Sequence, residues 1–265
     1  MTRFYLLFFL LISFNNFSFA QSPDTVIYSV VSSGGAIKGF DKIWKNADGS
    51  YGEWYQYNDR GRGDSLRIIF REDAEGFPLF LKVSGNDYMK NSVSEEFSLA
   101  NGVAKWKNNA EDEQNEVTGK FFYLGLKSGG GHIIKALKAN NNKIKMLPSG
   151  ETELTIIEKH VLGNGPETKL VWLAQVKGFG LTPAYSWIDS DNIDFAYVNE
   201  WQSSIHKGYE NYIDELLAIQ KKYESAFYSN LAATIPQKMD EWTLIKDVSL
   251  FDAEQAIILM PKDVL

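Results

Sequence analysis

The stretch Asn46-Ala47-Asp48-Gly49-Ser50-Tyr51-Gly52-Glu53-Trp54-Tyr55-Gln56-Tyr57 decides the fold class. Its Asp48-Gly49 pair supplies the positive φ that a tight hairpin needs. The aromatic run at 51–57 suits a pleated, half-buried surface, and a second strand at 37–45 precedes the turn. This segment therefore predicts a β-hairpin, in which two antiparallel strands are joined by a short turn.

The strand pattern continues outward from this hairpin, from Thr25 to about Val198. Further strands are expected at 26–30, 66–70, 79–83, 93–99, 103–107, 117–124, 151–161, 168–176, 185–188 and 194–198. Most of the gaps between them are too short for the helical crossover that parallel pairing requires, so the strands form an antiparallel meander. A long meander in a single sheet closes or curls. We therefore expect a mainly β (α+β) protein built on a curved sheet or half-barrel.

Two helices interrupt the strand pattern. A short helix is expected at 132–139, where Ile133, Ile134 and Leu137 could dock on the sheet. A long C-terminal amphipathic helix is expected at 203–230, because apolar residues recur there at helical spacing opposite a polar side of mixed charge. The mixed charge favours packing over one face of the sheet rather than binding to a membrane.

The chain divides into four expected parts. Residues 1–20 have the pattern of a signal peptide: Arg3, an apolar run at 4–12, and small residues at Ser18 and Ala20 that predict cleavage before Gln21. The β-rich domain spans 21–230, a linker spans 231–241, and strand pattern returns at 242–265. The protein is thus expected to be exported to the periplasm or the extracellular space, with no membrane attachment after cleavage.

The composition excludes several classes of function. The 265 residues include no cysteine, so disulfide scaffolds, cysteine nucleophiles and thiolate metal sites are excluded. The formal net charge of −7 gives no support to nucleic-acid binding, which depends on Lys and Arg neutralising phosphates. The three histidines, His132, His160 and His206, lie far apart and in no metal-binding spacing. We therefore expect no catalytic residue and no metal site in this chain.

Two loops carry the best candidate binding residues. The first joins two strands at 57–65 and the second follows a later strand at 85–90. In one interpretation they are hairpin ends whose Asp and Asn side chains cap their own turns. In the other, Arg60 and Arg62 grip a carboxylate of a ligand or of a neighbouring domain. The candidate set is Asp59, Arg60, Arg62, Asp64, Asp87 and Tyr88.

The same loops carry a family resemblance. Together with Glu95-Glu96-Phe97, Ala104-Lys105-Trp106-Lys107 and Phe122-Tyr123, they resemble an N-terminal extension of exported bacterial amidohydrolases of the imidazolonepropionase-like group. The resemblance covers about 26–225. The segment 244–252 is in turn similar to the opening strands of the small β-sandwich that precedes the catalytic barrel of that superfamily.

The resemblance implies a parent enzyme that hydrolyses C–N bonds with a divalent metal, zinc being the expected one. The H-x-H pair of that superfamily does not occur in this chain. The resemblance therefore implies a non-catalytic fragment, inactive alone, whose partners are the missing catalytic barrel or further copies of itself. The alternative is a free-standing periplasmic binding or carrier protein that holds an apolar ligand on its curved sheet. A self-contained enzyme with an unrecognised site is the third hypothesis.

Overall fold

The computed structural model describes residues 25–265 except 126–130, 166–167, 191–193 and 236–240. The chain forms two compact units, Met1–Leu217 and Ala218–Leu265. The expected signal peptide lies outside the described residues.

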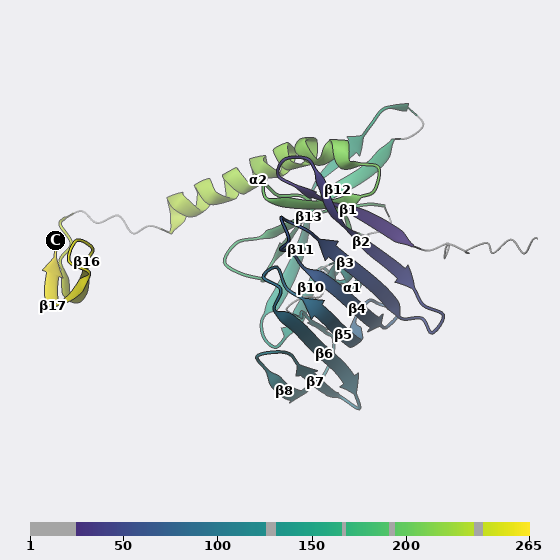
Figure 1. Cartoon of the computed structure of the whole chain (residues 1–265), viewed down its shortest axis with the longest axis horizontal. Helices are drawn as coiled ribbons and strands as arrows, with labels where there is room; N and C mark the ends of the chain where they lie inside the picture. Colours follow the sequence, from purple (N-terminus) through teal and green to yellow (C-terminus); the bar gives the residue numbers. More distant parts are fainter. Residues whose placement is uncertain (1–24, 126–130, 166–167, 191–193, 236–240) are drawn as a thin grey trace, which may run out of the picture. The chain divides into compact units, whose positions relative to one another are not determined.

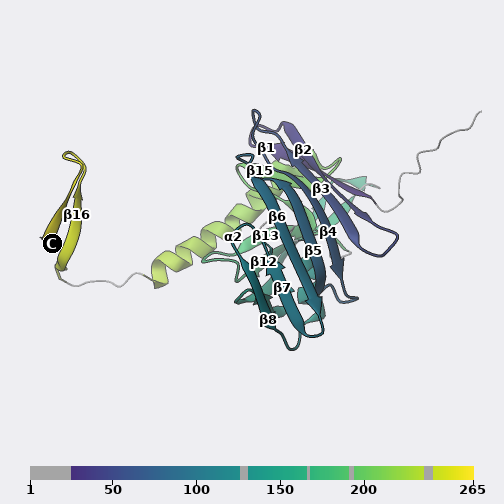
Figure 2. The ribbon, with the colours of Figure 1, turned by 60° about the horizontal axis from the view of Figure 1, so that its bottom comes forward.

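The first unit is built on one sheet of fifteen strands (Figures 1 and 2). Their order across the sheet is β8-β7-β6-β5-β4-β3-β2-β1-β15-β14-β13-β12-β11-β10-β9. The strands are β1 (Val26–Ser32), β2 (Ile37–Lys45), β3 (Tyr51–Tyr57), β4 (Ser65–Glu72), β5 (Pro78–Asn86), β6 (Ser92–Ala100), β7 (Val103–Lys107), β8 (Asp112–Glu116), β9 (Phe121–Tyr123), β10 (Lys143–Leu147), β11 (Glu151–Leu162), β12 (Lys169–Lys177), β13 (Ala184–Ile188), β14 (Asp194–Tyr197) and β15 (Gln202–His206). The sheet is large, curved and not closed, which confirms the mainly β fold expected from the sequence.

Most of the sheet is the antiparallel meander that the short gaps predict. The exception is β9, which pairs in parallel with β10. Between them runs the helix α1 (Gly131–Ala139), and it supplies the crossover that a parallel pair requires. The prediction missed β10. It also missed β8 (Asp112–Glu116), the edge strand that pairs with β7.

The curved sheet brings its β9 edge onto one face of β4–β7. We call this face the inner face; it is the one that carries Leu66, Phe97 and Trp106. The Phe97 and Tyr123 rings stack with 4.4 Å between their centroids, and the Tyr123 hydroxyl donates to Glu95 Oε1 at 2.7 Å. The buried cluster consists of Leu66, Ile68, Phe70, Leu81, Val83, Phe97, Ala104, Trp106, Phe121, Tyr123 and Leu147. The two ends of the sheet thus share one apolar core.

The helix α1 forms a second apolar core with β10–β13. Its Ile133, Ile134 and Leu137 are fully buried, as the helical spacing predicts. They pack against strand residues that include Ile144 and Leu154. Figure 1 shows α1 beside the strands of the curved sheet. The helix therefore holds the parallel β9–β10 crossover against the rest of the sheet.

The expected helix at 203–230 begins ten residues too early. Gln202–His206 is the strand β15, which lies between β1 and β14. In this strand Ser203 and Ile205 are buried while their neighbours are half-buried, which is the period of two of a strand. A short 3₁₀ turn, η2 (Glu210–Tyr212), then leads into the helix α2 (Ile213–Thr234).

The first turns of α2 belong to the first unit and contact the sheet. Leu216 is fully buried, and Glu215 Oε1 lies 2.6 Å from Nε2 of His160 on β11. No helix in the described residues is long and apolar enough to cross a bilayer.

The second unit ends in a two-stranded sheet of β16 (Ile245–Asp252) and β17 (Ile257–Val264). Its strands expose large apolar side chains, among them Phe251, Ile258 and Met260. An isolated two-stranded hairpin is only marginally stable in water, since it buries little apolar surface.

We predict that Phe97→Ala lowers the free energy of unfolding by about 3–5 kcal/mol, because it leaves a cavity under Tyr123 at the contact between the two ends of the sheet. Denaturant unfolding followed by tryptophan fluorescence measures this loss. Ile69→Ala is the control: Ile69 lies on β4, two strands from β6, but is 44% exposed, and its truncation costs about 0.5 kcal/mol. Equal losses in the two variants would contradict the shared core.

Candidate ligand-binding site

Two carboxyl side chains face the inner side of the sheet on neighbouring strands. The strand register sets Asp41 of β2 opposite Tyr55 of β3, and Glu53 of β3 opposite Ile43 of β2. Tyr55 in turn lies opposite Leu66 of the inner-face core. Because residues opposite one another share a face of the sheet, Asp41 and Glu53 are diagonal neighbours on the inner face. We call them the acid pair.

Neither member of the acid pair has a hydrogen-bond partner among the described residues. Glu53 is only 8% exposed, and the Oδ1 atom of Asp41 is buried without a donor. Burial raises the pKa of Asp41 to about 7. Burial, followed by the Asp41 carboxylate, raises the pKa of Glu53 well above its ordinary value. The acid pair therefore holds protons at a pH at which exposed carboxyl groups are ionised.

Tyr28 of β1 lies directly opposite Asp41 and extends the site toward β14. Its hydroxyl donates to the backbone oxygen of Asp194 at 2.5 Å. Burial raises the pKa of Tyr28, and the carboxylates of Asp194 and Asp41 raise it further. The Asp194 side chain accepts a hydrogen bond from Ser186 Oγ at 2.9 Å, and burial raises its pKa as well. The surroundings of the acid pair are thus acidic and largely dehydrated.

His206 of β15 lies opposite Tyr28 and joins the acidic surroundings to a surface pocket. Its ring meets the Tyr28 ring edge-on at 4.7 Å and stacks on Phe195 at 5.3 Å between centroids. Its Nε2 atom is buried without a hydrogen-bond partner in the described part of the chain. Burial lowers the pKa of His206, which keeps the imidazole neutral.

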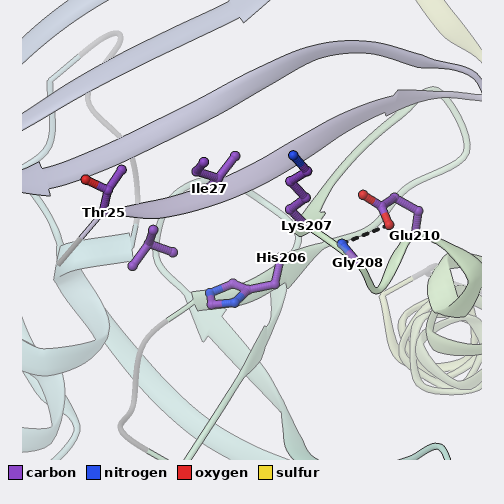
Figure 3. A pocket seen from close by; sticks show the side chains of 7 residues that line it. Thr25, Ile27, His206, Lys207, Gly208 and Glu210 are labelled. Atoms are coloured by element: carbon purple, nitrogen blue, oxygen red, sulfur yellow. Dashed lines mark hydrogen bonds between the residues drawn. The ribbon is translucent and has the colours of Figure 1, made fainter. Parts of the chain in front are cut away.

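The pocket has a volume of about 660 Å³ (Figure 3). It is lined by Thr25, Val26, Ile27, His206, Lys207, Gly208 and Glu210. Val26 lies opposite Ile43, and Ile43 lies opposite Glu53. With strands spaced about 4.8 Å apart, the backbone of Glu53 is about 10 Å from that of the pocket residue Val26. The pocket and the acid pair are therefore neighbours, because Val26, Ile43 and Glu53 lie opposite one another across β1, β2 and β3.

Three basic side chains of the first unit already contact carboxylates, and a fourth, Lys207, lines the pocket. Lys169 Nζ lies 2.9 Å from Asp189 Oδ2. His132 and Lys135 of α1 both contact the Glu72 carboxylate, at 3.4 and 2.5 Å. None of these side chains donates a hydrogen bond to Asp41 or Glu53. The described residues also include no group of three or more His, Asp or Glu side chains placed to hold a metal ion.

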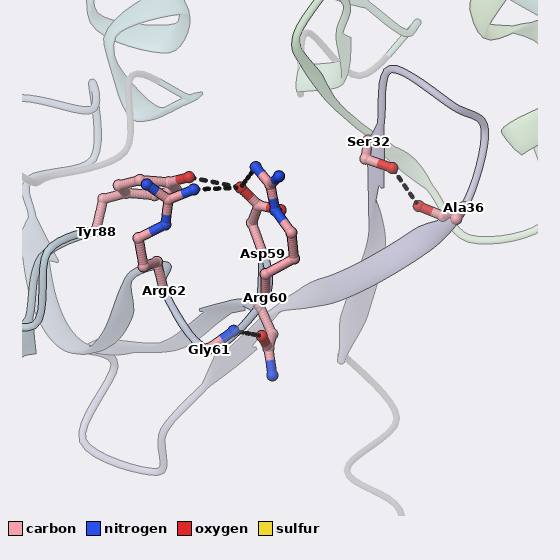
Figure 4. A network of polar contacts seen from close by, with 8 residues as sticks. Ser32, Ala36, Asp59, Arg60, Gly61, Arg62 and Tyr88 are labelled. Carbon is pink, nitrogen blue, oxygen red and sulfur yellow. Dashed lines mark hydrogen bonds and ion pairs between the residues drawn. The ribbon is translucent and has the colours of Figure 1, made fainter.

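The loop residues predicted from the sequence form a different network (Figure 4). Asp59 is its centre, and it accepts hydrogen bonds from Arg60 Nε at 2.9 Å and from the Tyr88 hydroxyl at 2.6 Å. Arg62 lies 3.5 Å from the same carboxylate and packs over the Tyr88 ring. The Arg60 and Tyr88 hydrogen bonds lower the pKa of Asp59 to about 2. The two loops therefore meet, and both arginines contact a carboxylate of their own chain.

The remaining two loop candidates lie in different settings. Asp87 caps its own turn, because its Oδ1 accepts from the backbone N–H groups of Met89 and Asn91, each at 2.9 Å. Asp64 directly precedes β4, and burial, with a smaller contribution from the Asp64 carboxylate, raises the pKa of Tyr55. These contacts match the self-capping interpretation of the loops. A binding role for the six loop residues stays a prediction.

The sequence reasoning missed Asp41, Glu53, Tyr28 and His206 as a group. A signal for the acid pair was present in the strand alternation. In the strand 51–57 the inward positions are Tyr51, Glu53, Tyr55 and Tyr57, so Glu53 occupies a position otherwise held by aromatic residues. A carboxylate at an inward strand position is costly and therefore informative.

Comparison with known proteins gives little family information. No protein-family model matches the chain, and no curated protein matches it. A similar solved structure is a beta-barrel-like protein of the domain of unknown function DUF1849 from Brucella abortus. It is 12% identical with a TM-score of 0.42, and the match covers 69% of this chain and 94% of that chain.

These findings correct the expected family. The resemblance to the N-terminal region of an amidohydrolase is wrong: no family model and no curated protein that would support it matches the chain. The expectation of a non-catalytic hydrolase fragment is wrong with it. The loop strings that suggested the family are accounted for by turn capping and by the Asp59 network, which need no common ancestry.

We predict that Asp41→Asn makes the protein more stable at pH 8 and leaves its stability at pH 4 unchanged. The pKa of Asp41 is about 7 in the folded chain, against about 3.9 when unfolded. The folded state therefore binds the extra proton, so stability falls as the pH rises from about 4 to 7 and stays low above that. Because an asparagine at this position cannot ionise, the variant should have a free energy of unfolding about 1–4 kcal/mol higher at pH 8.

Denaturant unfolding at pH 4, 6 and 8 measures this change. The control Glu113→Gln alters an exposed carboxylate on β8 and should follow the unaltered protein at each pH. A lower stability of Asp41→Asn at pH 8 would show that the Asp41 carboxylate is stabilised by a contact that the structure does not contain.

Proposed function

We propose that this chain is a binding protein that holds a small polar ligand on its inner face, at the acid pair, Tyr28 and His206. The observation that carries the proposal is a pair of buried atoms without a partner among the described residues, Asp41 Oδ1 and His206 Nε2. Glu53, which is 8% exposed, lies diagonally beside Asp41. These groups lie side by side on strands β15, β1, β2 and β3 and form an incomplete set of ligand contacts.

The energetic argument rests on the cost of an unmade hydrogen bond. A buried polar group without a partner costs about 1–3 kcal/mol, and charged groups cost more. Native proteins retain few such groups, and those that remain call for an explanation. A ligand that supplies hydrogen bonds to the acid pair and His206 would recover this free energy on binding. The pocket beside His206 offers a route for its entry.

The apolar ligand expected from the sequence has weaker support. The apolar section of the inner face, on β4–β7, is covered by the chain's own β9. The apolar faces of β10–β13 are likewise covered by α1. An apolar ligand therefore belongs in the test as a competing outcome.

Export to the periplasm or the extracellular space is part of the proposal and is supported by the pattern of the first twenty residues. The ligand would then be one that reaches the chain outside the cytoplasm. No catalytic residue is assigned, and the proposal includes no reaction.

We predict that at least one class of small polar ligand raises the melting temperature of the purified protein in a saturable way. Differential scanning fluorimetry against a panel of organic cations, carboxylates, neutral sugars and fatty acids measures the shift. A ligand present at a concentration one hundred times its Kd raises the free energy of unfolding by about 2.7 kcal/mol. For a domain of this size that corresponds to a rise in melting temperature of about 5–10 °C.

His206→Ala should reduce this shift, because it removes the group at the boundary between the pocket and the acidic surroundings. The exposed-site control Glu113→Gln should leave it unchanged. A panel in which only fatty acids stabilise the protein, or in which nothing does, would overturn the polar site.

A further inference from the structure

We propose that the inner-face site binds an organic cation whose ammonium or guanidinium N–H groups bridge Asp41 and Glu53. This inference rests on the proposed function and adds the chemical class of the ligand. Ammonium and guanidinium groups are donors without acceptors, and the acid pair, when ionised, offers only acceptors. An organic cation therefore complements the ionised acid pair both in charge and in hydrogen bonding, since one supplies donors and the other acceptors.

The charges around the acid pair favour a cation over an anion or a neutral molecule. After burial, the largest cause, four carboxyl groups raise the pKa of Tyr28: those of Asp194, Asp41, Asp189 and Glu53. Lys169 offsets one of them through its contact with Asp189. A carboxylate or phosphate ligand would meet repulsion here, whereas a cation replaces the missing counter-charge.

The aromatic rings beside the acid pair also suit an organic cation. Tyr28 and Tyr55 flank Asp41 on the two adjacent strands. His206 and Phe195 continue this aromatic wall beyond Tyr28. Ring faces attract ammonium and guanidinium groups and pack against the alkyl chain that carries them. A bare metal ion would use neither property.

Binding of a cation is expected to depend on pH with a definite sign. The acid pair must release protons before it can pair with a positive ligand, so affinity should rise as the pH rises toward 7–8. The other titratable groups around the site are Tyr28, Tyr55, Asp64, Asp189, Asp194, His132, Lys169 and His206, with Lys207 and Glu210 in the pocket lining. Of these, His206 loses its charge at a lower pH than usual, which works in the same direction.

Isothermal titration calorimetry tests the inference with matched probes. Butylammonium, 1,4-diaminobutane and agmatine are titrated into the purified protein, with 1-butanol and butyrate as the neutral and anionic counterparts of butylammonium. We expect at least one cation to bind one-to-one, and 1-butanol and butyrate to bind at least tenfold more weakly than butylammonium. Between pH 5.5 and 7 the affinity should rise by up to about tenfold per pH unit for each proton released. Repeating the titration in buffers with different ionisation enthalpies counts those protons.

Two isosteric variants assign the binding to the acid pair. Glu53→Gln and Asp41→Asn should each weaken cation binding at least tenfold and reduce the proton release, while their melting temperatures at pH 8 stay at or above that of the unaltered protein. Glu113→Gln is the matched control and should bind normally. Cation binding that survives both isosteric variants would overturn the inference, because the site would then lie elsewhere.

The two proposals fail in different ways. If no cation binds but a sugar or a carboxylate stabilises the protein and loses its effect in His206→Ala, the cation inference is wrong and the binding function stands. If no polar probe of any charge binds, both are wrong.

Discussion

The contact between the two ends of the sheet is the constraint on which the structure depends. Tyr123, on the β9 edge, stacks on Phe97 and donates a hydrogen bond to the buried Glu95 in the middle of β6. Without this contact the inner face of β4–β7 would expose a continuous row of large apolar side chains. With it, one sheet supplies both sides of its own core, and no second sheet is needed to cover this section.

The same curvature creates the polar section beside that core. The apolar side chains of β4–β7 and the helix α1 fill their parts of the inner face, but the rows through β1, β2 and β3 carry Tyr28, Asp41 and Glu53 instead. A stable fold alone would place apolar residues there, as it does one strand further along at Leu66 and Ile68. Local departures from good packing are concentrated at functional sites, and this one consists of carboxyl groups.

Strand alternation was sufficient to predict most of the fold, because a half-buried strand leaves a period of two that needs no tertiary information. The prediction failed where tertiary contacts override local pattern. Gln202–His206 lies next to a helix and contains a helix-compatible sequence, yet it pairs between β1 and β14. The β8 strand consists of residues that suit a loop and is extended only because β7 offers a free edge.

The site was harder to predict than the fold. The loop at 57–65 suggests a binding site because its charges are close in sequence, but Arg60 and Arg62 both pair with Asp59. The groups without partners, Asp41, Glu53 and His206, are up to 165 residues apart and meet only through the sheet register. Spacing along the sequence identifies neighbours within one helix or strand. A buried group without a hydrogen-bond partner can be identified only in the folded structure, where its surroundings come from several strands.

The acidic edge of the sheet has a consequence for self-association. An open sheet ends in unpaired backbone groups that can recruit a strand from another molecule. Here the edge strand β8 is fully exposed and carries Asp112, Glu113 and Glu116 within five residues. Asp112 pairs with Lys107, but two molecules meeting edge to edge would still bring together Glu113 and Glu116 of both copies. Electrostatic repulsion therefore opposes polymerisation through this edge, and acidification would weaken that protection.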